Sequence, residues 1–137
     1  MGHWITLDTT RGQVSAWLAE PAGTPRGALI VIQEIFGVNP HIRSIADGFA
    51  SEGYVALAPA YFDVIEPGVE LDYDVAGIAN GRELITQLGL DQANDIIGAE
   101  GKEQVVQFAT QPFDQFCGGG FAVRGVGDQG FGRFGGV

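Results

Sequence analysis

The sequence contains one carboxylate in a position suited to chemistry, Glu34, within the stretch IVIQEIFG at residues 30–37. The apolar residues before it are typical of a strand buried on both faces of a parallel sheet. Ligands of open α/β sheets collect at the carboxyl ends of such strands, so Glu34 is a candidate for binding or deprotonating a ligand there. The alternative interpretation is structural: a carboxylate that accepts backbone N–H groups in the following turn.

The second candidate is Cys117, which lies in the stretch FCGGG at residues 116–120. A nucleophile elbow is a tight turn between a strand and a helix, and the glycines after Cys117 would permit it. A thiolate nucleophile also needs an activating base or a helix N-terminus; without one, Cys117 is an inert cysteine in a glycine-rich loop. Since it is the only cysteine, no disulfide can form within the chain, and we expect a reducing, cytoplasmic location.

No other group of residues has the spacing of a metal or cofactor site. The only histidines are His3 and His41, and no cysteine–histidine spacing is typical of zinc. The glycines at 125, 127 and 130 match a dinucleotide fingerprint in their letters, but they follow no strand and open no helix. The acidic stretch 61–74 is predicted to be a solvated loop, because the spacing of a calcium-binding loop is absent. We therefore expect no cofactor and no metal.

The elements that must position these residues are those of an α/β fold. Apolar and polar residues alternate in two stretches that predict an antiparallel hairpin. After it, a strand, a helix and a strand have the lengths of a parallel crossover unit. Asn39 and Pro40 predict where that helix begins, and Gly53 where it has ended. The predicted strands are 3–9, 13–19, 28–32 and 54–58, and helical stretches are predicted after Asn39, at 75–90 and at 92–110.

Length and charge exclude several classes of function. The 137 residues suffice for one domain with a core. The net charge of −10 argues against nucleic acid and against anionic membrane surfaces as partners, since both require basic patches. The N-terminal residues lack the basic and apolar regions of a signal peptide, and no apolar run approaches the roughly 20 residues of a membrane span. We expect a small-molecule substrate.

Three stretches resemble the dienelactone hydrolase family (carboxymethylenebutenolidases), which are α/β-hydrolase-fold enzymes: QEIFGVN at 33–39, IRxxAD at 42–47 and GYVALAP at 53–59. The resemblance implies hydrolysis of an enol-lactone or a related ester through a cysteine acyl-enzyme. It implies that Glu34 helps to generate the Cys117 thiolate, and that the N–H groups of Ile35 and Gly118 bind the oxyanion. Arg82 lies close to the spacing of the arginine that holds the substrate carboxylate.

The sequence departs from the family after residue 112. Gln115 stands where the family has a glycine before its nucleophile, and after Cys117 the only acid is Asp128, with no histidine. We therefore expect a partial α/β-hydrolase domain at 1–112, a glycine-rich irregular tail at 113–137, and a truncated and impaired enzyme. The alternative is a non-catalytic α/β fragment that acts as an interaction module or is an inactive remnant. An exposed sheet edge would then favour self-association.

Overall fold

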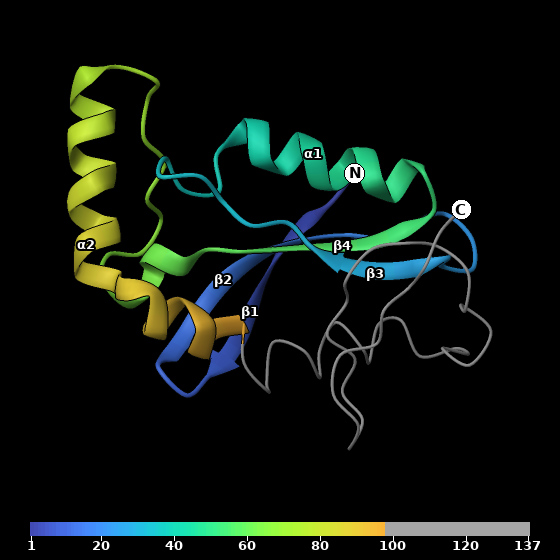
Figure 1. Cartoon of the computed structure of the whole chain (residues 1–137). Helices are drawn as coiled ribbons and strands as arrows, with labels where there is room; N and C mark the ends of the chain where they lie inside the picture. The colour runs from blue at the N-terminus through green and yellow to red at the C-terminus, as the bar shows by residue number, and fades with distance from the viewer. Residues whose placement is uncertain (98–137) are drawn as a thin grey trace.

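The computed structural model describes residues 1–97 of the chain (Figure 1). Strands and helices alternate in the second half of this region, after an N-terminal hairpin. The elements are β1 (His3–Thr9), β2 (Gly12–Ala19), β3 (Gly27–Ile30), α1 (Pro40–Ser51), β4 (Tyr54–Pro59), the short 3₁₀ helix η1 (Tyr61–Val64) and α2 (Val75–Ile97). The sheet has the order β1-β2-β4-β3. This arrangement confirms the predicted α/β class.

The predicted hairpin is present and brings two tryptophans together. β1 and β2 pair antiparallel from His3↔Leu18 to Thr9↔Gly12. The turn between them ends at Gly12, whose φ of 109° favours glycine. Trp4 and Trp17 are direct partners across the strands, and their rings meet edge to face with centroids 5.5 Å apart. Such a pair stabilises the hairpin on one face of the sheet.

The crossover unit β3–α1–β4 is also present, with β3 and β4 parallel. The Asn39 side chain accepts a hydrogen bond from the Ile42 N–H at 3.1 Å, and Pro40 occupies the first helical turn, as predicted. The predicted strand 28–32 is corrected to Gly27–Ile30. The last bond toward β4 runs from the Val31 N–H to the Leu57 carbonyl. Beyond it the chain leaves the sheet, and the Ile32 side chain is 63% exposed.

β4 lies in the middle of the sheet and is buried on both faces. Its Val55 and Leu57 point into a cluster with η1 and α2, whereas Ala56 and Ala58 point toward α1. Figure 1 shows α1 lying along one face of the sheet, while α2 stands at the end where β3 and β4 terminate. β4 therefore packs between α1 on one face and the cluster with η1 and α2 on the other, which explains its continuous apolar run.

α2 combines the two helical stretches predicted for this part of the chain. A break divides it at Gly89, where φ is 68° and ψ is 156°. Asp74 precedes the helix and accepts a hydrogen bond from the Gly77 N–H at 2.7 Å. The buried positions of α2 include Gly77, Gly81, Leu84 and Leu88, which recur at helical spacing. The predicted stretch from 98 to 110 and the predicted domain boundary after 112 lie outside the described residues.

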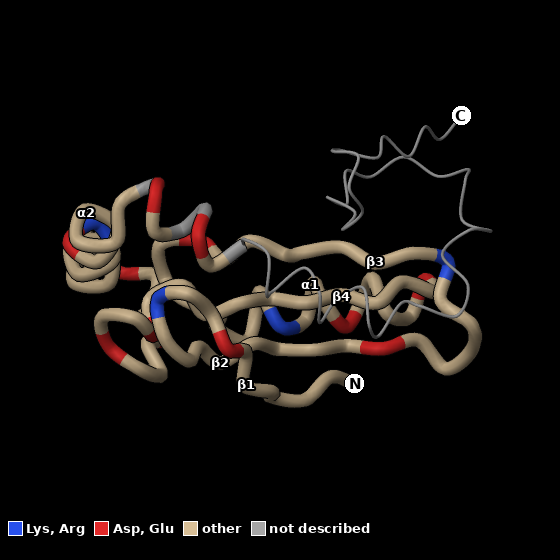
Figure 2. The backbone as a smooth tube through the Cα atoms, turned by 90° about the horizontal axis from the view of Figure 1, so that it is seen from below, with Lys and Arg blue, Asp and Glu red and all other residues tan. Residues whose placement is uncertain are grey.

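Acidic positions outnumber basic ones along the described backbone, as Figure 2 shows. Within residues 1–97, no helix has the length and the apolar character of a membrane span. No group of three or more metal-binding side chains is found in the same part of the chain.

Candidate active site

The QEIFG stretch forms a tight turn directly after β3. The Gly37 N–H contacts the Glu34 carbonyl at 3.3 Å, and the Leu71 N–H donates to the Phe36 carbonyl at 2.9 Å. Gly37 has a φ of 82°, and a methyl group there would lie 2.1 Å from the Val69 carbonyl oxygen. Only glycine meets both requirements, so this residue fixes the turn against the loop that precedes α2.

The opposite side of the turn packs against α2 at Gly81. A methyl group on Gly81 would lie 2.3 Å from the carbonyl oxygen of Ile35. Gly77, one helical turn earlier, makes a similar approach to the Asp72 carbonyl. These glycines weaken α2 as a helix in isolation, but Gly81 allows the helix backbone to touch the turn, and Gly77 allows it to touch the preceding loop. The position of Ile35 is thus set by backbone contacts.

Glu34 is exposed, and its carboxylate is held by a hydrogen bond from another loop. The Tyr73 hydroxyl donates to Oε2 of Glu34 at 3.1 Å, and Nδ2 of Asn39 donates to the same hydroxyl at 2.9 Å. The Tyr73 ring packs on Phe36 with centroids 4.4 Å apart. Because Glu34 is exposed, its ionised carboxylate carries little desolvation cost, although it follows an apolar strand.

The backbone of Ile35 offers a free donor beside this carboxylate. Ile35 is half-buried. Among residues 1–97, no hydrogen bond uses its N–H group. An unused N–H on a rigid turn is the type of group that stabilises a developing oxyanion.

Gln33 fastens the turn to the end of β4. Its Oε1 accepts from the Tyr61 N–H at 3.0 Å, and its Nε2 contacts the Glu34 carbonyl at 3.2 Å. Sequence reasoning assigned no part to Gln33 or to Tyr73. The only available signal for Gln33 was its place in the family stretch, and Tyr73 stood in an acidic loop without periodicity.

The remaining predicted site residues are only partly within the described chain. Arg82 lies on α2 next to Gly81, is exposed, and has no side-chain partner among residues 1–97. No contact brings it to Glu34. Cys117 and Gly118 lie outside the described residues. Of the predicted site residues, the described part of the chain therefore contains Glu34 and Ile35, which are neighbours in sequence, and Arg82.

Tyr61, whose backbone N–H binds Gln33 of the turn, has a phenol with a raised pKa. Its ring is 3% exposed in the core cluster, and its hydroxyl has no hydrogen-bond partner in the described region. Burial raises the pKa of this hydroxyl well above its usual range, because ionisation in an apolar site is unfavourable. The phenol therefore stays neutral, whereas its backbone N–H serves Gln33.

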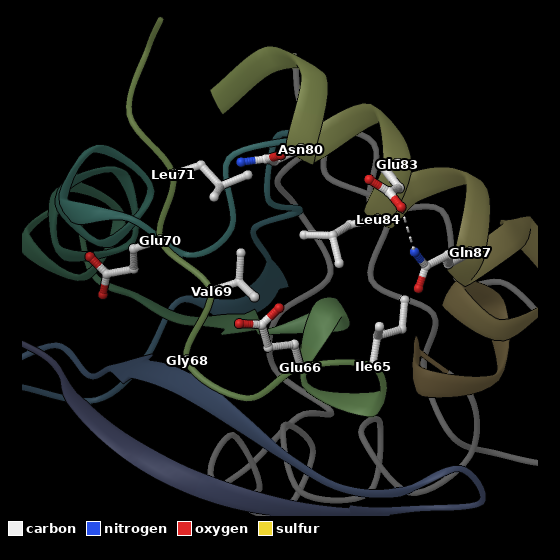
Figure 3. Close-up of a pocket in the computed structure, with 10 residues that line it drawn as sticks. All are labelled: Ile65, Glu66, Gly68, Val69, Glu70, Leu71, Asn80, Glu83, Leu84 and Gln87. Atoms are coloured by element: carbon white, nitrogen blue, oxygen red, sulfur yellow. Dashed lines mark hydrogen bonds between the residues drawn. The ribbon is translucent and has the colours of Figure 1, made fainter. Parts of the chain in front are cut away.

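A cavity of about 490 Å³ opens beside the site but does not include it. Figure 3 shows it between the loop before α2 and the helix itself, with apolar side chains such as Leu84 and carboxylates such as Glu66 and Glu83. A smaller cavity of about 220 Å³ lies near Trp4 and Asp63. Neither is lined by Glu34 or Ile35. Within residues 1–97, Glu34 is exposed and Ile35 is half-buried, and neither lines these two cavities.

Comparisons with known proteins identify the family of this chain. The sequence model of the dienelactone hydrolase family matches residues 14–115. A carboxymethylenebutenolidase of Pseudomonas sp. is 35% identical over 115 residues, which are 83% of this chain and 45% of that protein. A Synechocystis protein named "putative carboxymethylenebutenolidase" is 45% identical over 84 residues, which are 61% of this chain and 34% of that protein. The chain thus spans less than half the length of these relatives.

A solved structure is similar in fold. The crystal structure titled "putative dienelactone hydrolase" from Klebsiella pneumoniae superposes with a TM-score of 0.56 at 22% identity, and the match covers 85% of this chain and 46% of that one. The family match covers most of this chain, and it includes the turn that carries Glu34 and Ile35. The chain therefore belongs to the dienelactone hydrolase family.

Proposed function

We propose that this protein is a carboxylic ester hydrolase that cleaves an enol-lactone or a related ester through Cys117. The proposal is supported by one turn after β3 that carries an exposed carboxylate, Glu34, and the Ile35 N–H, which no hydrogen bond within residues 1–97 uses. Family membership and the names of the relatives support the substrate class. Arg82, exposed and free of ion pairs within residues 1–97, is suited to a substrate carboxylate.

In the proposed reaction, Glu34 accepts the proton of the Cys117 thiol, and the thiolate attacks the ester carbonyl carbon. The N–H groups of Ile35 and Gly118 donate to the oxyanion; one such donor contributes about 3 kcal/mol to the transition state. The carbon–oxygen bond to the leaving group then breaks, and the leaving oxygen takes up a proton. Water hydrolyses the thioester. We propose that this second step is slower than acylation, so that the acyl-enzyme accumulates.

The test is pre-steady-state hydrolysis of p-nitrophenyl acetate and of a dienelactone. We expect a burst of p-nitrophenolate that matches the enzyme concentration, followed by slow turnover. Cys117→Ser should abolish the burst, and Glu34→Gln should slow it by about 100-fold, as for the loss of a general base. His41→Gln is the control, because His41 is exposed at the start of α1. Equal activity in wild type, Cys117→Ser and Glu34→Gln would refute both assignments.

Arg82 can be tested separately by comparing substrates. Arg82→Gln should raise KM for the anionic dienelactone and leave KM for the neutral p-nitrophenyl acetate unchanged, because only the dienelactone carries a carboxylate. A KM that rises equally for both substrates would refute the role of Arg82.

The second candidate function is an interaction module. Among residues 1–97, β3 pairs with β4 alone, and the Ile32 side chain that follows β3 is 63% exposed. An open apolar edge favours pairing with a second chain. We propose self-association through this edge, in a cytoplasmic protein. Size-exclusion chromatography tests it: Ile32→Lys should shift the chain to a monomer, and a wild-type monomer would contradict the proposal.

A further inference from the structure

The hydrogen bonds around Tyr73 have a fixed direction. Oδ1 of Asn39 accepts from the Ile42 N–H at 3.1 Å, so the amide must point its Nδ2 the other way. Nδ2 then donates to the Tyr73 hydroxyl at 2.9 Å. The hydroxyl has one proton, and its oxygen is occupied by this donor. The proton is therefore directed to Oε2 of Glu34 at 3.1 Å.

We propose that Tyr73 is a positioning residue that, with Asn39 behind it, holds the Glu34 carboxylate in one orientation. The catalytic part of this inference rests on the proposed function. Oε2 is engaged by Tyr73, whereas Oε1 of Glu34 has no partner among the described residues. The two hydrogen bonds from Asn39 to Tyr73 and from Tyr73 to Glu34 form a relay. This relay leaves Oε1 of Glu34 available to accept a proton from the nucleophile.

The two residues that hold Glu34, Asn39 and Tyr73, differ in how deeply they are buried. Asn39 is 3% exposed and is the only buried polar residue among those described, so its amide is held by the start of α1. Tyr73 is 59% exposed, although its ring lies on Phe36. The Tyr73 hydroxyl thus connects a rigid helix terminus to an exposed carboxylate. Its removal affects orientation rather than the core.

Tyr73→Phe keeps the ring contact with Phe36 and removes only the hydroxyl. The control is Tyr54→Phe, at the start of β4, whose ring lies 5.2 Å from the Arg26 guanidinium. Asn39→Ser retains an oxygen that can cap α1 but is too short to reach Tyr73. It should give a smaller effect in the same direction. All variants are made in the full 137-residue chain.

Two measurements separate the relay from the hydrolase proposal. Three-bond NMR couplings of the Glu34 side chain should indicate one rotamer in wild type and Tyr54→Phe, but an average in Tyr73→Phe. This result does not depend on activity. In the burst assay with p-nitrophenyl acetate, Tyr73→Phe should reduce the acylation rate constant by about tenfold, as for one lost bond to a carboxylate. The concentration for half-saturation should not change.

A double variant shows whether Tyr73 acts through Glu34. Tyr73→Phe should have no further effect in a Glu34→Gln background. Unchanged Glu34 couplings in Tyr73→Phe, an unchanged acylation rate, or an additive loss in the double variant would each overturn the positioning role. Wild type without a burst would refute the hydrolase proposal instead, and the couplings would still decide whether the relay exists.

Discussion

Gly81→Ala should destabilise the protein, although alanine is the better helix former. Gly81 lies inside α2, where exchange for alanine in an exposed helix would stabilise by about 1 kcal/mol. At this position the added methyl group would lie 2.3 Å from the Ile35 carbonyl oxygen and 3.1 Å from its carbonyl carbon. The tertiary contact therefore opposes the helix propensity.

The geometry sets the magnitude. Ordinary contact begins at 3.4 Å, so the methyl group and the Ile35 oxygen must separate by about 1 Å. Overpacking of this kind costs about 1–3 kcal/mol. The contacted atoms belong to the backbone of a turn that cannot rotate away as a side chain can, which favours the upper end. After the gain in helix propensity, the expected net loss is about 2 kcal/mol.

The assay is urea denaturation followed by circular dichroism, with Gly48→Ala as the matched control. Gly48 is also inside a helix, α1, but it is exposed and a methyl group there meets no atom within 4 Å. Gly48→Ala should therefore stabilise by about 1 kcal/mol. The same substitution in two helices is expected to have opposite signs.

A functional measurement accompanies the stability measurement. If the turn yields, the Ile35 N–H moves with it, and a displacement of about 1 Å can reduce a rate by about 100-fold. If Gly81→Ala changed the free energy of unfolding by the same amount as Gly48→Ala, the reasoning would be refuted. A destabilised Gly81→Ala that keeps the full acylation rate would also refute it, since the proposed oxyanion donor would then be independent of α2.

Two further predictions concern the buried hydroxyl of Tyr61 and the half-buried carboxylate of Asp63. Tyr61→Phe removes a hydroxyl without a partner among the described residues and should stabilise by about 1 kcal/mol at neutral pH. Burial raises the Tyr61 pKa, so above about pH 10 the tyrosine ionises in the unfolded chain but not in the folded one. Wild type should therefore lose up to about 1.4 kcal/mol of stability per pH unit in this range, measured by urea denaturation. An equal alkaline loss in Tyr61→Phe would contradict this. Asp63→Ala should cost about 2 kcal/mol, since Asp63 accepts from the N–H groups of Ser15 at 2.7 Å and Gly68 at 3.1 Å. The exposed Asp8→Ala is its control and should change thermal stability little.

The crossover unit could be predicted because its signals are local. Asn39, Pro40 and Gly53 mark the ends of α1 within a few residues, and they do so in the structure. Glu34 was singled out by its place after a predicted buried strand, and Ile35 through the short family stretch that follows it. The end of β3 was misjudged because apolar character continues to Ile32, whereas the bonds to β4 end at Val31.

The rest of the site depends on contacts between distant parts of the chain. Tyr73 reaches Glu34 across 39 residues of sequence, and no period in the acidic loop indicates that contact. In the sequence, Gly81 is only a residue of low helix propensity inside a predicted helix. The requirement for glycine at this position comes from the close approach of the Ile35 carbonyl, which only the three-dimensional structure shows. Sequence alone therefore proposed the chemical groups of the site, but it could not predict the contacts that hold Glu34 and Ile35 in place.

The central place of β4 also has a consequence for the order of folding. Its parallel pairs with β3 join residues 27 apart in sequence, such as Gly27 and Tyr54. Its antiparallel pairs with β2 join residues at least 37 apart, such as Ala19 and Ala56. Closing the longer loop costs more chain entropy before any contact is gained. We expect the β1–β2 hairpin and the crossover unit to form separately and the β2–β4 ladder to join them last, so that damage to this ladder mainly accelerates unfolding.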